Sequence, residues 1–429
     1  MTLPRILAIM GSGETAPTMV STHRRLTSLL PQPVRAVVLD TPYGFQENAP
    51  ELAKRAVDYF ATSVNVNLQI AGLARMQPNE RGDVPDAVAI EKGLRIVDDA
   101  NYVFAGPGSP TYSLRQWHDS PLRSMLIRKL TTGGVVTFAS AAALTLGRRT
   151  VPVYEIYKAG VDPYWLEGLD VLGEFGISAT VIPHYDNAEG GHHDTRFCYL
   201  GERRLGALET HFSDDEFIVG IDEHTGLVMD FDRDVAEIVG NATVTLRRGS
   251  LEKKFSKGDS IPLAELRRPS WNTRGTTTET TTLQSAKTPP NDSPGEVAAP
   301  TSLKAAVDRY RAAFDTAVAQ LDADAAVGAL LALEAEIRGW SADTLQGPDR
   351  DHAVATLRLM ISKLGEVATG GLRDPRSVAE PFVSGFLAVR AVVRAEKRFD
   401  LSDLVRDQLL AAGIEVRDTK DGVEWVMRS

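Results

Sequence analysis

Residues 133–147 of the chain read GGVVTFASAAALTLG, and this stretch predicts how the first half of the protein folds. Its first part, Val135 to Phe138, is β-branched and aromatic, which is typical of a buried strand. Its second part, Ala141 to Leu146, is rich in helix-forming residues. Ser140 lies at the junction between small neighbours, the pattern of a nucleophile elbow in which a strand turns sharply into a helix. The alternative is a buried strand and an alanine-rich core helix with Ser140 as its N-cap, because the usual Gly-x-Ser-x-Gly is not intact.

Strands and helices alternate along the chain upstream of this stretch. Such alternation predicts an α/β domain with a mostly parallel, doubly wound sheet and helices on both of its faces. From Phe217 to Leu246, short apolar runs separated by turn residues predict an antiparallel end to the sheet. The expected strands are Arg5–Met10, Val34–Leu39, Val64–Ile70, Asn101–Ala105 and Ile177–Pro183, and the expected helices are Glu51–Ala61, Ala87–Ala100 and Leu114–Leu130.

Four strand ends carry loops that are rich in glycine or contain serine, at Gly11–Gly13, Thr41–Gly44, Gly106–Pro110 and Ala139–Ala141. In a parallel sheet the carboxyl ends of the strands converge on one edge, where ligands bind. This convergence favours a functional role for Ser140. The first of these loops is an incomplete dinucleotide fingerprint, so we expect no nucleotide cofactor there.

A histidine follows the strand expected at Ile177–Pro183. In this position His184 is a candidate general base, and the alternative is a histidine that only caps the strand end by hydrogen bonding. His192-His193-Asp194 contains metal-binding residue types but has no distant partner at ligand spacing. We therefore expect no metal site in that loop.

The composition restricts the classes of partner and compartment. Lys and Arg number 47 against 57 Asp and Glu, a formal net charge of -10, which argues against a globally basic nucleic-acid binder but leaves room for a local patch. Cys198 is the one cysteine, so no intrachain disulfide can form, and a reducing compartment fits. No apolar run reaches the ~18 residues that span a bilayer, and Met1 to Met10 lacks the features of a signal peptide. We expect a cytoplasmic protein without a membrane partner.

Residues 5–250 resemble the peptidase E and cyanophycinase family of serine peptidases, which has a class I glutamine-amidotransferase-like α/β fold with a serine nucleophile. The elbow at residues 138–143 (FASAAA) resembles the family's Gly-Thr-Ser-Ala-Gly-Ala, and residues 181–186 (VIPHYD) resemble its proline-histidine-aromatic segment. Residues 220–227 (GIDEHTGL) resemble its Gly-Ile-Asp-Glu-x-Thr-Gly-Leu strand-turn-strand. Residues 106–109 (GPGS) occupy the place of its Gly-Gly-x-Gln loop, which helps to form the oxyanion hole.

The resemblance implies a role for each site residue. Ser140 would attack the carbonyl carbon of the substrate, and His184 would take the serine proton and give it to the leaving amine. In peptidase E the acid that orients the imidazole lies shortly after the elbow, where Glu155 stands in this chain. The backbone N–H groups of Gly108 and Ala141 would hold the oxyanion. We expect neither a metal nor another cofactor.

Two residues depart from the family's motifs. Ala142 replaces the glycine two residues after the serine, which crowds the elbow, and Pro107 has no N–H to donate in the oxyanion loop. Because the serine, the histidine and an acid remain, we expect an active hydrolase. The alternative is a decayed peptidase fold that only binds other molecules.

Substrate identity is left open by these motifs. Members of the family cleave aspartyl dipeptides or a β-aspartyl-arginine bond, and selectivity for such an acid requires a cation in the pocket. Arg148, Arg149 and Lys158 are candidates, and ordinary surface roles are the alternative for each.

The second half of the chain differs in composition. Thr276–Pro300 holds threonine runs and prolines with almost no large apolar residue, which predicts a flexible linker. Apolar residues at helical spacing resume at Leu303 and predict an all-α bundle of about four or five helices. The expected domains are an α/β hydrolase domain at 1–265, a linker at 266–302 and a helical domain at 303–429.

Residues 303–429 resemble the C-terminal region of cysteinyl-tRNA synthetase. Residues 406–409 (RDQL) match its Arg-Asp-x-Leu helix, and residues 413–425 (GIEVRDTKDGVEW) match its Gly-Ile-x-Val-x-Asp-Thr-x-x-Gly-x-x-Trp motif. The synthetase's nucleotide-binding catalytic domain and zinc ligands are absent, so we expect no tRNA charging. Because the synthetase contacts tRNA with this region, the resemblance implies tRNA binding through Arg390, Arg394, Lys397, Arg406 and Arg417.

Acidic residues are interleaved with these basic ones, so a solvated helix face, a dimer contact or a protein-binding surface is the alternative. Both resemblances together predict a serine hydrolase that cleaves an amide in a small peptide or aminoacyl conjugate, directed to tRNA or a tRNA-like substrate by its C-terminal domain. The alternative is a catalytically inactive tRNA- or protein-binding module. By analogy with small α/β hydrolases we expect a homodimer.

Overall fold

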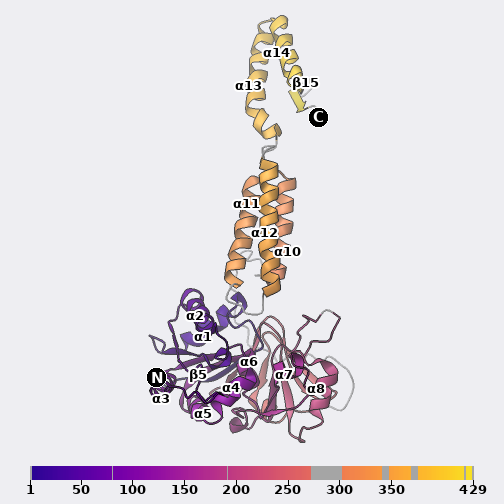
Figure 1. Ribbon diagram of the computed structural model, residues 1–429. Helices are drawn as coiled ribbons and strands as arrows, with labels where there is room; N and C mark the ends of the chain where they lie inside the picture. The colour runs from indigo at the N-terminus through magenta and orange to yellow at the C-terminus, as the bar shows by residue number, and fades with distance from the viewer. Residues whose placement is uncertain are drawn as a thin grey trace. The chain divides into compact units, whose positions relative to one another are not determined.

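A computed structural model describes residues 2–79, 81–190, 192–271, 302–340, 347–368, 375–419 and 422–427. The chain forms two compact units (Figure 1). The first, the α/β unit, comprises Met1–Thr301 and Gly339–Gly347, and the second, the C-terminal unit, comprises Ser302–Arg338 and Pro348–Ser429. The linker expected at Thr276–Pro300 lies outside the described residues.

An eight-stranded sheet forms the centre of the α/β unit. Its parallel strands are β1 (Arg5–Met10), β2 (Ala36–Leu39), β3 (Leu68–Ile70), β4 (Tyr102–Ala105) and β5 (Gly134–Ala139), and its antiparallel strands are β10 (Thr225–Asp230), β11 (Val235–Gly240) and β14 (Ser260–Pro262). The strand order is β14-β11-β10-β1-β5-β4-β2-β3. The predicted α/β class, with a mostly parallel sheet that ends in antiparallel strands, is confirmed.

A second, four-stranded sheet carries part of the predicted antiparallel region. Its strands are β8 (Ala179–Ile182), β9 (Phe217–Ile221), β12 (Thr243–Arg248) and β13 (Leu251–Ser256). They run in the order β13-β12-β9-β8, and β8 pairs with β9 in parallel. The strand expected at Ile177–Pro183 therefore belongs to this smaller sheet and not to the large one. A short pair, β6 (Arg149–Thr150) with β7 (Leu166–Glu167), forms a separate two-stranded sheet.

Helices cover both faces of the large sheet. One face carries α1 (Val20–Ser28) and α2 (Ala49–Tyr59), and the other carries α3 (Ala87–Asp99), α4 (Pro110–Trp117) and α5 (Leu122–Thr132). Successive residues of β1 point to opposite faces: Leu7 and Ile9 join the core with α3, α4 and α5, whereas Ile6 and Ala8 join the core with α1 and α2. Because β1 is buried on both faces, apolar residues occupy every position from Ile6 to Met10.

Two expectations about boundaries differ from the structure. The helix expected at Leu114–Leu130 is two helices, α4 and α5, because Pro121 at the start of α5 has no N–H to continue the first one. The first residues of the expected linker belong to the α/β unit. Leu266 is buried in α9 (Leu263–Arg267), and Trp271 packs on the core.

The C-terminal unit is largely helical. Its helices are α10 (Leu303–Ala319), α11 (Ala323–Gly339), α12 (Gly347–Ala368), α13 (Pro375–Ala395) and α14 (Phe399–Ala411). The predicted helical region is confirmed in this respect. No helix among the described residues is long and apolar enough to cross a membrane.

The expectation of an all-α C-terminal domain is wrong for its last residues. They form a hairpin of β15 (Ile414–Thr419) and β16 (Gly422–Met427). Alternate residues Ile414 and Val416 are buried with Val383 of α13 and Leu409 of α14, so the period of two that marks a strand is present in the sequence. Asp418 of β15 accepts two hydrogen bonds from the buried guanidinium of Arg390, at 2.8 and 2.9 Å.

Candidate active site

The backbone at Ser140 has the shape of a nucleophile elbow. β5 ends at Ala139 in an extended conformation, and α6 (Ser140–Leu144) begins at the next residue. Ser140 has a φ of 50°, a left-handed value that is strained for a residue with a side chain. Strain of this kind persists where the surrounding structure fixes a functional side chain. Ala142 is fully buried in the core, so the elbow forms with alanine in the place of the family's glycine.

The structure brings Ser140 and His184 together. His184 follows β8, is buried, and its Nε2 lies 2.9 Å from the hydroxyl oxygen of Ser140. Its Nδ1 lies 2.9 Å from Oε1 of Glu223. Because a carboxylate only accepts, Nδ1 carries the proton and donates to Glu223. Nε2 is then unprotonated and accepts the hydrogen bond from the serine hydroxyl, as a general base requires.

Glu223 is fixed by its own partners. Its backbone N–H donates to Asp186 at 2.7 Å, and its Oε1 accepts a second hydrogen bond from Asn187 at 3.1 Å. The segment that carries it follows β9, the parallel neighbour of β8, with Ile182 opposite Gly220. The chain leaves both strands at the same edge, and this places His184 and Glu223 side by side.

The expectation that Glu155 orients the imidazole is wrong in this structure. The one N–H of the neutral His184 ring donates to Glu223, which leaves no donor for a second carboxylate. Glu155 lies in α7 (Val153–Tyr157), and its Oε2 is buried without a hydrogen-bond partner among the described residues. The acid that contacts the imidazole is Glu223, which belongs to the motif at residues 220–227. The prediction of Glu155 rested on its distance along the chain from the elbow.

The surroundings of His184 raise the pKa of its imidazole. Burial lowers the pKa of His184, but the hydrogen bond and charge of Glu223, with the charges of Glu14 and Glu189, outweigh it and raise the pKa above 6.5. Burial raises the pKa of Glu223, but the bond to His184 outweighs this and holds that pKa below its ordinary value. The pair is therefore built to stabilise the charge that forms when the histidine takes a proton.

The two predicted oxyanion donors line the same pocket as the serine and the histidine. Gly108 has a φ of 143°, and a Cβ at this position would lie 2.0 Å from the carbonyl oxygen of Pro42. Only glycine fits there. The next residue, Ser109, caps α4 by accepting from the backbone N–H of Tyr112 at 3.1 Å. Ala141, the other predicted donor, lies in the first turn of α6 and lines the pocket.

The pocket at Ser140 has a volume of about 510 Å³. Its walls are α2 with the chain before it, the loop at 107–110, α7, and the residues His184, Glu189, Cys198 and Tyr199. Its lining is rich in tyrosines: Tyr43, Tyr154, Tyr157 and Tyr199.

Charged side chains of both signs reach this pocket. Lys158 lies 5.1 Å from the ring of Tyr157, and no carboxylate of the described residues lies within ion-pair distance of it. Glu189 accepts from the hydroxyl of Tyr199 at 2.8 Å. Of the other candidate cations, Arg149 donates to the buried Glu216 at 2.9 Å and does not line the pocket.

Residues 197–199 form a left-handed segment that is hydrogen-bonded to the backbone of His184 and Tyr185. The sequence pattern did not predict this segment. Phe197, Cys198 and Tyr199 have φ values of 61°, 54° and 66°. The backbone N–H groups of Phe197 and Cys198 donate to the carbonyls of Tyr185 and His184 at 3.0 and 3.1 Å. Burial and the charge of Glu223 raise the pKa of the Cys198 thiol to about 12, so this pocket residue stays a neutral thiol and not a second nucleophile.

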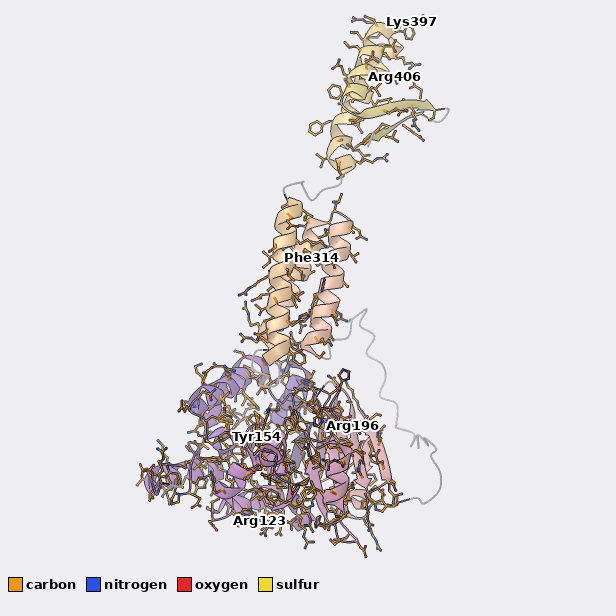
Figure 2. The ribbon with its side chains drawn as sticks, turned by 45° about the vertical axis from the view of Figure 1, so that its right-hand side comes forward. Arg123, Tyr154, Arg196, Phe314, Lys397 and Arg406 are labelled. Carbon is orange, nitrogen blue, oxygen red and sulfur yellow. The ribbon has the colours of Figure 1, made fainter. Side chains whose placement is uncertain are left out.

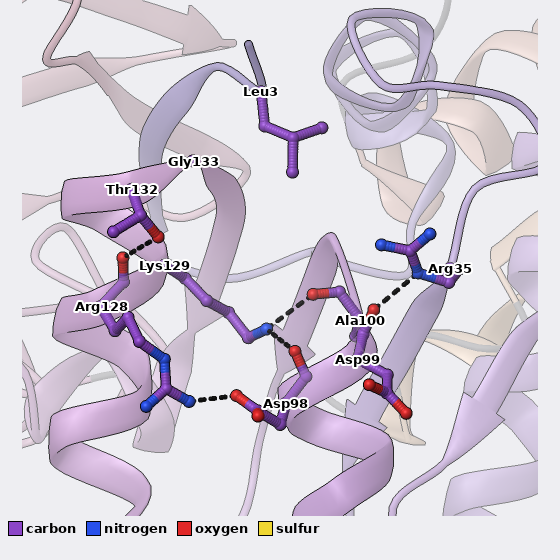
Figure 3. A pocket seen from close by; sticks show the side chains of 9 residues that line it. All are labelled: Leu3, Arg35, Asp98, Asp99, Ala100, Arg128, Lys129, Thr132 and Gly133. Atoms are coloured by element: carbon purple, nitrogen blue, oxygen red, sulfur yellow. Dashed lines mark hydrogen bonds and ion pairs between the residues drawn. The ribbon is translucent and has the colours of Figure 1, made fainter. Parts of the chain in front are cut away.

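Another hollow lies where the chain enters β1, β2, β4 and β5, at the opposite edge of the sheet (Figure 3). Lys129 is buried there and donates to the carbonyls of Asp98 and Ala100 at 2.8 and 2.6 Å. These bonds cap the carboxyl end of α3. The hollow contains none of the residues predicted for the active site.

The five basic residues predicted to contact tRNA divide into two groups. Arg390 is buried against Asp418, Arg394 donates to the same carboxylate at 3.2 Å, and Arg417 donates to Glu415 at 3.0 Å. Lys397 and Arg406 are exposed and have no carboxylate partner among the described residues (Figure 2). Only the last two present uncompensated charge to solvent.

Comparison with known proteins gives matches of two kinds, to peptidase structures and to cysteine–tRNA ligases. No protein-family model matches the chain. A solved peptidase structure from an acI-B1 Actinobacterium is similar to 61% of this chain and 98% of its own, with a TM-score of 0.48 and 20% identity. Cysteine–tRNA ligase of Chlorobium luteolum is 45% identical over 76 residues, 17% of this chain, and that of Streptococcus pyogenes serotype M28 is 40% identical over 60 residues, 14% of this chain. The chain spans only 15% and 13% of the lengths of these two ligases.

The assignment of the acid can be tested with a matched pair of variants. Glu223→Gln should lower kcat/KM for p-nitrophenyl acetate roughly 10²- to 10⁴-fold, because a neutral amide does not stabilise the imidazolium. Glu155→Gln should leave kcat/KM close to the wild-type value. Initial-rate kinetics on both folded variants measure this, and a loss confined to Glu155→Gln would return the orienting role to Glu155.

The rate should also depend on pH in a defined direction. Since the pKa of His184 is raised above 6.5, kcat/KM for the same ester should fall as the pH drops through a midpoint above 6.5, where the protonated ring can no longer accept the serine proton. In Glu223→Gln the midpoint should move to lower pH, because burial then dominates. A pH–rate profile measures both midpoints, and a wild-type midpoint below 6.5 contradicts this electrostatic account.

Proposed function

We propose that the α/β unit is a serine hydrolase that cleaves an amide bond in a small peptide or an aminoacyl conjugate. The observation that carries the proposal is the continuous chain of contacts from Ser140 to His184 to Glu223, each 2.9 Å long, beside a pocket that Ser140 and His184 line. A nucleophile, a base and an orienting acid in this geometry recur on unrelated folds that perform acyl transfer.

The reaction would proceed in two steps. Ser140 attacks the carbonyl carbon while Nε2 of His184 takes the hydroxyl proton, and Glu223 stabilises the imidazolium that results. The N–H groups of Gly108 and Ala141 receive the oxyanion of the tetrahedral intermediate. The imidazolium then protonates the leaving amine, and a water activated by the same histidine releases the acyl group from the serine.

The pocket supports a small substrate with charged groups. Its volume of about 510 Å³ fits a short peptide and not a folded protein surface. Tyrosine rings offer apolar walls with polar tips. Lys158 provides a cation that suits a substrate carboxylate, and Glu189 provides an anion that suits an ammonium group.

The alternative, a decayed and catalytically inactive fold, rests on Ala142 and Pro107. The elbow keeps its positive φ with alanine at position 142. Pro107 cannot donate, but the following Gly108 retains its N–H and lines the pocket. These observations favour the active enzyme over the inactive binding module.

We further propose that the C-terminal unit directs this activity to tRNA or a tRNA-like molecule in a reducing cytoplasm. Its support is the similarity to cysteine–tRNA ligase together with the exposed charges of Lys397 and Arg406. Basic residues without acidic partners are those that can neutralise phosphates. A C-terminal unit that only pairs two copies of the chain is the alternative.

A substrate panel tests the hydrolase. Aspartyl dipeptides, β-aspartyl-arginine and cysteinyl-tRNA should include at least one substrate that the wild type hydrolyses and Ser140→Ala does not. Ser28→Ala, which changes an exposed serine of α1, is the control and should keep the wild-type rate. Mass spectrometry of the products identifies the bond that is cleaved. Failure of the folded wild type to hydrolyse any member, together with tRNA binding, would favour the inactive binding module.

Binding of tRNA tests the role of the C-terminal unit. In fluorescence anisotropy, the double variant Lys397→Glu/Arg406→Glu should bind tRNA more weakly and should lower the slope of log affinity against log salt by about 2, one for each lost phosphate contact. Lys92→Glu/Lys257→Glu changes two exposed lysines of the α/β unit and matches the change in net charge. An equal effect of both pairs would show that only overall charge matters.

A further inference from the structure

The glycine-rich turn after β1 has no part in the proposed reaction, yet it lies against the segment that carries Glu223. A Cβ on Gly11 would lie 2.1 Å from the carbonyl oxygen of Asp222, and one on Gly13 would lie 2.0 Å from Nδ1 of His224. The hydroxyl of Ser12 accepts from the backbone N–H of His224 at 3.2 Å. Residues 11–13 therefore form a cradle, a turn that packs against Asp222 and His224. Glu223 is the residue between these two in the sequence.

His224 is itself held in a strained position. It is buried, its φ is 51°, and its Nδ1 lies 3.2 Å from the hydroxyl of Thr18. Its carbonyl accepts from the backbone N–H of Asn241 at 3.0 Å. A left-handed residue next to the orienting acid persists only if its surroundings fix it.

One of those surroundings comes from a distant part of the sequence. Trp340 belongs to the stretch Gly339–Gly347, which is part of the α/β unit although it follows α11. Its side chain is 1% exposed, and its ring meets the ring of His224 edge to face, with centroids 5.2 Å apart and planes at 79°. This is a favoured geometry for an aromatic pair. His224 is thus in contact with both the turn after β1 and the ring of Trp340.

We propose that Trp340 is a positioning residue for the active site. It holds His224 in the cradle, and through the adjoining backbone it fixes the carboxylate of Glu223 against Nδ1 of His184. The α/β unit would then depend on a residue beyond position 301 for the alignment of its acid. This inference rests on the proposed hydrolase, and a misplaced acid would lower kcat and leave KM little changed, because it affects the chemical step and not the walls of the pocket.

The test uses the full-length chain and reads the His184–Glu223 bond directly by NMR. In the wild type, the Nδ1 proton of His184 should give a low-field resonance that Glu223→Gln abolishes, and the pKa of the ring should lie above 6.5. In Trp340→Ala the resonance should weaken through exchange with water. The pKa of His184 should fall, because the bond to Glu223 that raises it is loosened while the burial that lowers it remains. The charges of Glu14 and Glu189 still raise this pKa and limit the fall.

Two variants separate positioning from general stability. Trp340→Phe keeps an aromatic edge and should restore the resonance and the pKa. Trp425→Ala removes a buried tryptophan of the C-terminal unit and should leave both unchanged. If Trp340→Ala does not fold, Trp340→Leu, which keeps apolar volume without an aromatic ring, should show the same loss. A folded Trp340→Ala or Trp340→Leu with a wild-type resonance and pKa would overturn the proposal.

Kinetics give a second readout. On a substrate that the wild type hydrolyses, Trp340→Ala should lower kcat by roughly 10²-fold, the scale of a small misplacement of a catalytic group. The NMR readout needs no turnover. A wild type that hydrolyses nothing would therefore count against the proposed hydrolase, whereas an unchanged His184–Glu223 bond in the Trp340 variants would count against the positioning role.

Discussion

The hydrogen bond from Nδ1 of His184 to Glu223 is the contact on which the site depends. It fixes the tautomer of the imidazole, and so it decides that Nε2 can accept from Ser140. The bond exists because β8 and β9 are parallel neighbours and the chain leaves both at one edge. The eight-stranded sheet supplies the serine from the end of β5, while the smaller sheet supplies the base and the acid. The site is therefore assembled where the two sheets present their strand ends to one pocket.

Much of the fold and part of the site could be predicted from the sequence. Runs that are apolar at every position, such as Ile6–Met10, indicate strands buried on both faces, and small residues around Ser140 indicate a sharp turn. The pattern also placed a histidine at the end of β8. The sequence did not identify Glu223. The motif at residues 220–227 was interpreted only as strand-turn-strand, which does not show which of its residues faces the imidazole. Glu155 was chosen because it lies shortly after the elbow along the chain. The three successive left-handed residues at 197–199 could not be predicted, because none of them is a glycine or an asparagine. Tertiary hydrogen bonds impose their conformation.

The C-terminal unit illustrates a different limit of the sequence. The resemblance implied tRNA binding through five basic residues, but the sequence does not show which carboxylate each of them pairs with. Arg390 and Arg394 both bind Asp418, which lies in a hairpin that the helical pattern did not predict. The ion pair between the buried Arg390 and the exposed Asp418 connects α13 to β15, so an arginine that was expected to bind phosphate instead links two elements of the unit. Any contact with nucleic acid must use the exposed charges that remain.

The central claim is that His184 activates Ser140, and covalent labelling tests it most directly. The folded full-length chain would be treated with a fluorophosphonate, digested and mapped by mass spectrometry. The account predicts a single adduct on Ser140, because only a serine with a general base at hydrogen-bond distance reacts readily with such a probe. A folded chain without an adduct, or with its adduct on another serine, would contradict the account and leave the contacts of Ser140 with a purely structural role.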